Sequence, residues 1–333
     1  MTEINITKIG VLGAGSWGTA LAVSMLRTKK EVLIWSRSEA VTSSINNERC
    51  NNYLPDMIIP EGVSSTNNIN DVIKCDVLLI VIPAQTIREN CEALKNAGIG
   101  KNVPLVICCK GIEIGTEKLM SEVVKEVLPE NPIAILSGPN FANEVANGLP
   151  TCTTLACEEQ ESGMRLVEAL GCHVFRTYYT NDIIGAQIGG AVKNVLAIAC
   201  GIATGKGLGE NARAAIVTRG MAEITRLCVA KGGKAETLMG LSGIGDIMLT
   251  CGSRTSRNMS FGYELGKGVS VKELTDGKAK LAEGVATAKS VSELARSLGV
   301  DMPICYAVND IIFNNADIDK VVMSLLSRPL TVE

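Results

Sequence analysis

Residues 8–22 read KIGVLGAGSWGTALA. An apolar run at Lys8–Leu12 predicts a buried strand, and it leads directly into Gly13, Gly15 and Gly18 before a helix start. In this pattern the first two glycines allow a tight turn and a close approach of the backbone to a pyrophosphate, and the third allows helix and strand to pack closely. A glycine-rich turn without a ligand would not explain three glycines at this spacing. The stretch therefore predicts a dinucleotide-binding strand-turn-helix unit.

Short apolar runs alternate with amphipathic stretches through the first half of the chain. We interpret these runs as strands at Lys8–Leu12, Val32–Trp35, Val77–Ile82, Leu105–Cys109, Ile133–Leu136, Thr153–Ala156 and His173–Thr177. This rhythm is typical of a parallel sheet with helices on its faces. After Asp182 the chain reads as helices. We predict an α/β protein, with an N-terminal Rossmann-like, mostly parallel sheet domain (1–180) followed by an all-α C-terminal domain (181–333), the two packing directly and forming a cleft.

Composition excludes several classes of function. The 333 residues carry 32 basic and 35 acidic side chains, a net charge of −3, with no long basic run, so a general affinity for nucleic acid or anionic lipid is not expected. The N-terminus lacks a basic segment followed by an apolar core, which favours a cytoplasmic protein. The twelve cysteines are scattered through apolar runs and read as reduced core residues. With His173 as the single histidine and no zinc-type spacing, we expect no metal site.

The segment 183–203, IIGAQIGGAVKNVLAIACGIA, carries only three polar side chains, those of Gln187, Lys193 and Asn194. A helix that is apolar on nearly every side is a buried helix, and a buried ammonium needs a counter-charge, a cleft or a chemical role. Lys193 is therefore a candidate for chemistry, and the alternative is that its head reaches water at the edge of the helix. A membrane span is disfavoured by the central Lys-Asn pair and the four glycines of the segment.

The residues after the second predicted strand bear on the choice of cofactor. An acidic residue there would bind the ribose hydroxyls of NAD, but the chain has Trp35-Ser36-Arg37-Ser38. An arginine can accommodate the 2′-phosphate of NADP. We therefore favour NADPH with NADH as the alternative, while a solvated surface role for Arg37 stays open.

Further polar residues follow later strands or lie in the helical half. Lys110-Gly111 and the segment 137–142, SGPNFA, each follow a strand, at the edge where open α/β sheets bind ligands. In the helical half, Asp246 is a lone carboxylate among apolar residues. It could be the partner that Lys193 requires, or a helix cap after a glycine. Arg257 and Asn258 would make a fork-like anion site.

Together these motifs resemble one family, the bacterial NAD(P)-dependent sn-glycerol-3-phosphate dehydrogenases. The resemblance extends in order from about residue 8 to about residue 290. Its motifs are the glycine stretch 13–18, Lys110-Gly111, Gly138-Pro139 with Phe141-Ala142, Lys193-Asn194, Arg219 to Glu223, Gly243 to Cys251, Ser256-Arg257-Asn258 and Glu283-Gly284-Val285.

The resemblance implies the reversible reduction of dihydroxyacetone phosphate to sn-glycerol 3-phosphate for phospholipid synthesis. It implies that Lys193 protonates the forming alkoxide and that Asp246 holds and tunes it. Burial would lower the pKa of Lys193 and Asp246 would raise it. No metal is expected, and homodimers through the helical domain are common in the family.

The resemblance also assigns binding residues. The substrate positions are Lys110, Gly138, Asn140, Lys193, Asn194, Asp246, Thr250, Ser256, Arg257 and Asn258. The cofactor positions are Gly13, Gly15, Ser16, Trp17, Gly18, Arg37, Tyr53, Lys110, Ala142, Arg257, Leu281 and Glu283. Asn140 departs from the family, which commonly has Ser or Thr there, although an amide can also bond to substrate oxygens.

Two other functions would account for part of these motifs. A related two-domain reductase of another hydroxy acid or hydroxy phosphate would share the glycine loop and a helix-borne lysine, but would not be expected to carry Ser256-Arg257-Asn258. A non-catalytic dinucleotide sensor would keep the glycine loop but would have no use for Lys193 opposite Asp246.

Overall fold

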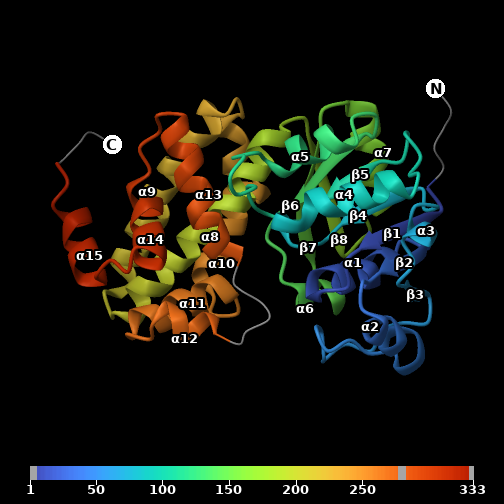
Figure 1. Ribbon diagram of the computed structural model, residues 1–333, viewed down its shortest axis with the longest axis horizontal. Coiled ribbons are helices and arrows are strands. Elements are labelled where there is room, and N and C mark those ends of the chain that lie inside the picture. The colour runs from blue at the N-terminus through green and yellow to red at the C-terminus, as the bar shows by residue number, and fades with distance from the viewer. Residues whose placement is uncertain (1–5, 277–282, 330–333) are drawn as a thin grey trace. The chain divides into compact units, whose positions relative to one another are not determined.

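The computed structural model describes residues 6–276 and 283–329. The chain forms two compact units, coloured blue to green and yellow to red in Figure 1. The first comprises Met1–Lys110 and Lys118–Gln187, and the second comprises Gly111–Glu117 and Ile188–Glu333. The division falls inside a single long helix, a few residues beyond the last strand.

The first unit is built on one eight-stranded sheet. Its strands are β1 Lys8–Leu12, β2 Glu31–Trp35, β3 Val63–Thr66, β4 Val77–Ile80, β5 Leu105–Ile107, β6 Ile133–Ser137, β7 Thr151–Cys157 and β8 Phe175–Thr180. Their order is β3-β2-β1-β4-β5-β6-β7-β8, and only the β6–β7 pair is antiparallel. The prediction of a mostly parallel Rossmann-like sheet is therefore confirmed. Every predicted strand overlaps an observed one, whereas β3 was not predicted, because three of its four residues are Ser or Thr.

The two faces of the sheet bury separate apolar clusters. Strand side chains alternate between the faces, so Val32 and Ile34 of β2 join one cluster while Leu33 joins the other. The strand side chains on the first face pack with the helices Ser16–Leu26 (α1) and Gln160–Leu170 (α7). Those on the second face pack with the helices Ile87–Asn96 (α4) and Met120–Val127 (α5). The helices of this unit are α1 Ser16–Leu26, α2 Glu39–Ser43, α3 Ile69–Val72, α4 Ile87–Asn96, α5 Met120–Val127, α6 Ala142–Ala146 and α7 Gln160–Leu170. Burial on both faces explains why the strands read as continuous apolar runs.

From Ile188 onward the described elements of the second unit are helices, as the sequence predicts, whereas Gly111–Glu117 forms no helix. Its helices are α8 Ile183–Gly205, α9 Gly209–Ala230, α10 Asp246–Gly252, α11 Arg257–Gly266, α12 Val271–Thr275, α13 Glu283–Ser297, α14 Pro303–Phe313 and α15 Ile318–Leu326. α8 and α11 approach backbone to backbone, because a Cβ on Gly262 would lie 2.1 Å from the carbonyl oxygen of Ile198. Glycine is required where helices pack this closely.

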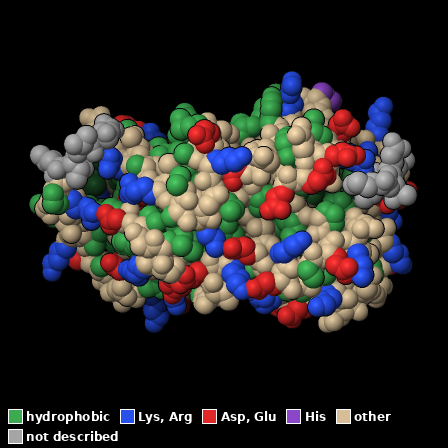
Figure 2. All heavy atoms as spheres, turned by 90° about the horizontal axis from the view of Figure 1, so that it is seen from above, with side chains coloured by type: hydrophobic (Ala, Val, Ile, Leu, Met, Phe, Trp, Pro, Cys, Tyr) green, Lys and Arg blue, Asp and Glu red, His purple; other side chains and the backbone are tan. Residues whose placement is uncertain are grey.

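α8 is the core helix of this unit. By length and composition it could cross a membrane, but 89% of its most apolar 18-residue window is buried inside the protein. The core helix of a folded protein passes the same length and composition test. On the protein face shown in Figure 2, basic and acidic side chains are interspersed. This mixture agrees with the net charge of −3.

A buried carboxylate, Glu223 of α9, holds the start of α14. Its two carboxylate oxygens accept hydrogen bonds from the backbone N–H groups of Ile304 at 2.8 Å and Cys305 at 3.2 Å. A carboxylate is favoured at a helix N-terminus, where the N–H groups lack helical partners. Burial nevertheless raises the pKa of Glu223 from 4.5 to about 7, and the two backbone hydrogen bonds oppose that rise only in part.

The raised pKa of Glu223 predicts a loss of stability with increasing pH. Between about pH 4.5 and 7 the unfolded chain releases the carboxyl proton of Glu223 while the folded chain keeps it. The contribution of this proton to the free energy of unfolding is therefore complete below about pH 4.5 and lost above about pH 7. Glu223→Gln, neutral at every pH, should reduce the fall in unfolding free energy across this window by about 3 kcal/mol. Urea unfolding at several pH values measures the difference, with the exposed Glu236→Gln as control. An unchanged pH slope in Glu223→Gln would contradict the prediction.

Candidate active site

The glycine loop between β1 and α1 has the geometry that a dinucleotide phosphate requires. Gly13 has a positive φ of 120°, and a Cβ there would lie 2.4 Å from the carbonyl oxygen of Val81. A Cβ on Gly18 would lie 1.9 Å from the carbonyl oxygen of Gly13, so the helix can start this close to the strand only with glycine. A Cβ on Gly15 would point into open space with no atom within 4 Å. The loop is therefore open at Gly15. This residue directly precedes the N-terminus of α1, which no side chain caps and which favours a bound phosphate.

A second loop, 51–57, packs against this one. The buried amide of Asn51 donates to the carbonyl oxygen of Ala14 at 2.9 Å and to the hydroxyl of Thr19 at 2.8 Å. The Ser16 hydroxyl donates to the carbonyl oxygen of Tyr53, whose side chain is 42% exposed. Ser16 and Tyr53, predicted separately, thus lie in contact. Sequence reasoning missed Asn51, since an asparagine in a polar stretch gives no signal of burial.

Two other predicted cofactor positions belong to the same region. Trp17 and Ala142, the first residue of α6, are both half-buried and pack on one small apolar cluster that includes Leu54 and Ala146. Arg37 is exposed directly after β2, where Ser36 donates its backbone N–H to the carbonyl oxygen of Thr66. The carboxyl ends of β1 and β2 therefore carry the glycine loop and an arginine, as the sequence predicts.

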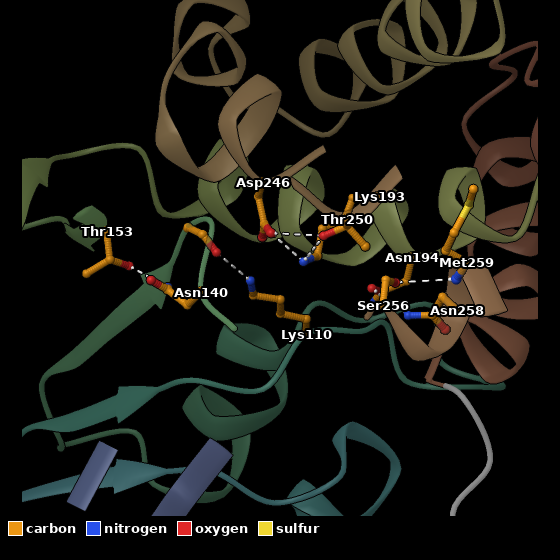
Figure 3. Close-up of polar contacts among 11 residues, drawn as sticks. Lys110, Asn140, Thr153, Lys193, Asn194, Asp246, Thr250, Ser256, Asn258 and Met259 are labelled. Atoms are coloured by element: carbon orange, nitrogen blue, oxygen red, sulfur yellow. Dashed lines mark hydrogen bonds and ion pairs between the residues drawn. The ribbon is translucent and has the colours of Figure 1, made fainter. Parts of the chain in front are cut away.

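The polar residues after β5 and β6 also meet. The ammonium of Lys110 donates to the carbonyl oxygen of Gly138 at 3.1 Å, and the Asn140 amide donates to the Thr153 hydroxyl at 3.2 Å (Figure 3). The Oδ1 atom of Asn140 is buried and accepts no hydrogen bond from the described protein. A Cβ on Gly138 would lie 2.9 Å from the Cα of Thr153. Close packing on β7 thus requires a glycine at 138.

Lys193, Asp246 and Thr250 form a buried polar cluster in the second unit. Their side chains point toward one another in Figure 3. The Lys193 ammonium donates to Asp246 Oδ1 and, at 2.8 Å, to the Thr250 hydroxyl, which itself lies 3.2 Å from Asp246 Oδ1. Asp246 is fully buried and Lys193 is 8% exposed. Asp246 is therefore the counter-charge that Lys193 requires, and it is the first residue of α10 rather than a helix cap.

This ion pair is costly to bury. Removing two charges from water costs several kcal/mol per ion, and their attraction offsets that cost only with good geometry and further hydrogen bonds. Thr250 supplies one such bond. The neighbouring Cys251 thiol is also fully buried, and its contact with Cys200 and its burial raise its pKa well above the ordinary range. The thiol beside the pair is therefore neutral.

Asn194 and Asn258 form a second link between helices of this unit. The Asn258 amide donates to Asn194 Oδ1 at 2.9 Å (Figure 3). Its own oxygen accepts the backbone N–H of Gly284 at 3.0 Å. Ser256 caps α11, since its hydroxyl accepts the N–H of Met259 at 3.3 Å. Arg257, the first residue of α11, is exposed. The amide predicted as an anion ligand is thus bound largely within the protein, and Arg257 is the accessible member of the motif.

Of the last two predicted cofactor positions, Glu283 is the first residue of α13, and Leu281 lies outside the described residues.

Comparison with known proteins assigns both units to one family. Residues 8–163 match the N-terminal domain, and residues 182–323 the C-terminal domain, of NAD-dependent glycerol-3-phosphate dehydrogenase. The chain belongs to this family. It is 49% identical over 328 residues to glycerol-3-phosphate dehydrogenase [NAD(P)+] of Maricaulis maris, covering 98% of each chain. The corresponding protein of Caulobacter vibrioides is 48% identical over 330 residues, again 98% of each.

A solved structure agrees with this assignment. Glycerol-3-phosphate dehydrogenase from Coxiella burnetii superposes with a TM-score of 0.92 at 38% identity, covering 97% of this chain and 99% of that one. The predicted family, fold and enzyme class are therefore confirmed. Because glycerol-3-phosphate dehydrogenases match over the whole length, a reductase of another hydroxy acid or a dinucleotide sensor is not favoured.

Proposed function

We propose that this protein catalyses the reversible NADPH-dependent reduction of dihydroxyacetone phosphate to sn-glycerol 3-phosphate, with NADH as an alternative cofactor. The product supplies glycerophospholipid synthesis. The observation that carries the proposal is the buried cluster of Lys193, Asp246 and Thr250 in a chain of this family. Residues 1–180 are assigned to dinucleotide binding and 181–333 to substrate binding and catalysis.

The first unit supplies most of the cofactor site. Support comes from the open side of the glycine loop at Gly15 and from the contacts that gather Ser16, Trp17, Tyr53 and Ala142 beside it. The dinucleotide, when bound, supplies the hydride. Arg37 is placed after β2 to meet the adenosine ribose or its 2′-phosphate. The complete proposed cofactor set is Gly13, Gly15, Ser16, Trp17, Gly18, Arg37, Tyr53, Lys110, Ala142, Arg257, Leu281 and Glu283.

Lys193 is the proposed proton donor. As the carbonyl oxygen of the substrate becomes an alkoxide, a placed ammonium protonates it, and in the reverse direction the amine takes the proton back. Asp246 and Thr250 orient the ammonium, because each accepts one of its N–H bonds.

The substrate phosphate is assigned to Arg257. A guanidinium binds phosphate oxygens in a bidentate manner, and its place in the first turn of α11 adds the favourable end of the helix dipole. Asn258 and Asn194 hold α8, α11 and the start of α13 together, since their amides bond to each other and to Gly284. Lys110, Gly138, Asn140 and Ser256 complete the proposed substrate set. Asn140 contributes an amide oxygen that accepts no hydrogen bond from the described residues.

The space at Gly15 predicts a selective loss of cofactor affinity. Gly15→Ala places a methyl group where no protein atom lies within 4 Å, so the free protein should keep its melting temperature. The same methyl group occupies the phosphate approach and should weaken NADPH binding about tenfold or more. Fluorescence titration measures this, with Gly100→Ala as control. Equal dissociation constants for Gly15→Ala and the unaltered protein would remove Gly15 from the cofactor site.

A homodimer through the helical unit and a cytoplasmic location are also proposed, on the family resemblance. Light scattering during size-exclusion chromatography measures the dimer directly. A mass of one chain, 35.2 kDa, at micromolar protein would refute it.

The proposed reaction is tested by the loss of NADPH absorbance, and then of NADH absorbance, when purified protein meets dihydroxyacetone phosphate. Unphosphorylated dihydroxyacetone is the matched control. Oxidation that requires the phosphate supports the enzyme, its substrate class and its anion site. Cofactor binding without oxidation of either cofactor would refute the proposal.

A further inference from the structure

A short turn directly before Asp246 positions its carboxylate. Residues Leu241–Gly245 form one π-helical turn, and α10 begins directly at Asp246. Asp246 and Thr250 are four residues apart and therefore lie on one face of α10. Any shift of the turn would move both acceptors of the Lys193 ammonium together.

Gly243, at the centre of the turn, is buried against backbone. A Cβ there would lie 2.0 Å from the carbonyl oxygen, 2.4 Å from the Cα and 2.5 Å from the carbonyl carbon of Leu238. Leu238 lies in the short helix Ala235–Met239, and its side chain is fully buried. Backbone atoms cannot rotate away as a side-chain end can. A larger residue at 243 would therefore displace the turn.

The same turn also contacts α8. A Cβ on Gly189 would lie 2.4 Å from the carbonyl oxygen of Ser242, so the helix and the turn are in direct backbone contact, and it would lie 3.1 Å from Cδ2 of Leu238. Gly189 precedes Lys193 by four residues, one turn along the same face of α8. The turn is thus packed against both Leu238 and the helix that carries Lys193. This packing fixes the position of Asp246 relative to the ammonium.

We infer that Gly243 is a positioning residue for the reaction, acting through Asp246 and Thr250 on Lys193. The inference rests on the proton-donor role proposed above. Catalytic groups must be held closely, and a misplacement of about 1 Å can cost about a hundredfold in rate. The role inferred for Gly243 is to allow the turn to pack closely against Leu238.

The test uses Gly243→Ala with Gly252→Ala as the matched control. Gly252 is the last residue of α10, and a Cβ there would come no closer than 3.8 Å to another group. Gly243→Ala should lower kcat for dihydroxyacetone phosphate reduction at least about tenfold while the dissociation constant of NADPH stays unchanged. Gly252→Ala should keep kcat within about twofold. A kcat within twofold in folded Gly243→Ala would overturn the inference.

Combination with Asp246→Asn separates positioning from general damage. If Gly243 acts through Asp246, the double variant should be no slower than Asp246→Asn alone, because effects of residues acting as a unit are not additive. Two losses that multiply would show that Gly243 acts elsewhere and would overturn the inference. If Asp246→Asn itself keeps the original kcat, the proposed role of the ion pair fails instead.

If Gly243→Ala does not fold, Gly189→Ala tests the same inference. Its methyl group displaces the same turn through the carbonyl oxygen of Ser242, and the same double-variant cycle applies. A multiplicative loss, or an unchanged kcat, in Gly189→Ala would then overturn the inference.

Discussion

Lys193→Ala is expected to lower kcat for dihydroxyacetone phosphate reduction about a hundredfold or more, the usual contribution of a placed general acid. The loss should fall on kcat, since the ammonium is proposed to act as the alkoxide forms. The substitution also leaves the Asp246 carboxylate buried without its partner, which destabilises the second unit. Steady-state rates should therefore be measured well below the melting temperature of the variant.

The control for this substitution is Lys206→Ala. Lys206 follows the end of α8 and pairs with Asp319 at the surface, so its loss should change neither kcat nor NADPH affinity. Turnover within a few-fold of the unaltered protein in Lys193→Ala would show that another group donates the proton.

Arg257→Ala is expected to raise KM for dihydroxyacetone phosphate about tenfold to a hundredfold, with a smaller change in kcat. Hydrogen bonds to charged groups are worth about 1.5 to 3 kcal/mol, and the phosphate is the charged part of the substrate. The effect should weaken as salt increases, since the guanidinium is exposed. Initial rates over a range of substrate concentrations measure it.

Arg254→Ala provides a matched control three residues earlier. Arg254 lies over the ring of Tyr263 at 3.8 Å and pairs with Glu264, so it is already engaged by the protein. Its loss should leave KM almost unchanged. If Arg257→Ala does the same, the phosphate binds elsewhere.

Much of this molecule could be predicted from the order of its residue types. The glycines at 13, 15 and 18 follow a strand and precede a helix, which is the dinucleotide-binding fingerprint of the Rossmann fold. An apolar helix with one lysine at its centre predicts a buried partner, and Asp246 is the single carboxylate among the apolar residues of the segment 243–250. Continuous apolar runs predict strands covered on both faces, which is how β1, β2 and β4 are packed.

Other features depend on contacts between distant residues and leave little trace in the sequence. β3 is a strand because its backbone pairs with β2, despite a short sequence of mainly Ser and Thr. Asn51 is buried because two acceptors of the glycine loop lie within its reach. The amide of Asn258 joins Asn194 to Gly284, and its own segment does not indicate these partners. Such partners are chosen by tertiary packing, which the pattern of one segment does not reveal.

In the proposed reaction a hydride from the nicotinamide reaches the carbonyl carbon of dihydroxyacetone phosphate. The most direct test uses NADPH with deuterium in both positions at C4 of the nicotinamide ring, and mass analysis of the product. We expect glycerol 3-phosphate that carries one deuterium, located at C2, even in ordinary water. Product with only solvent hydrogen at C2, or no glycerol 3-phosphate at all, would contradict the account.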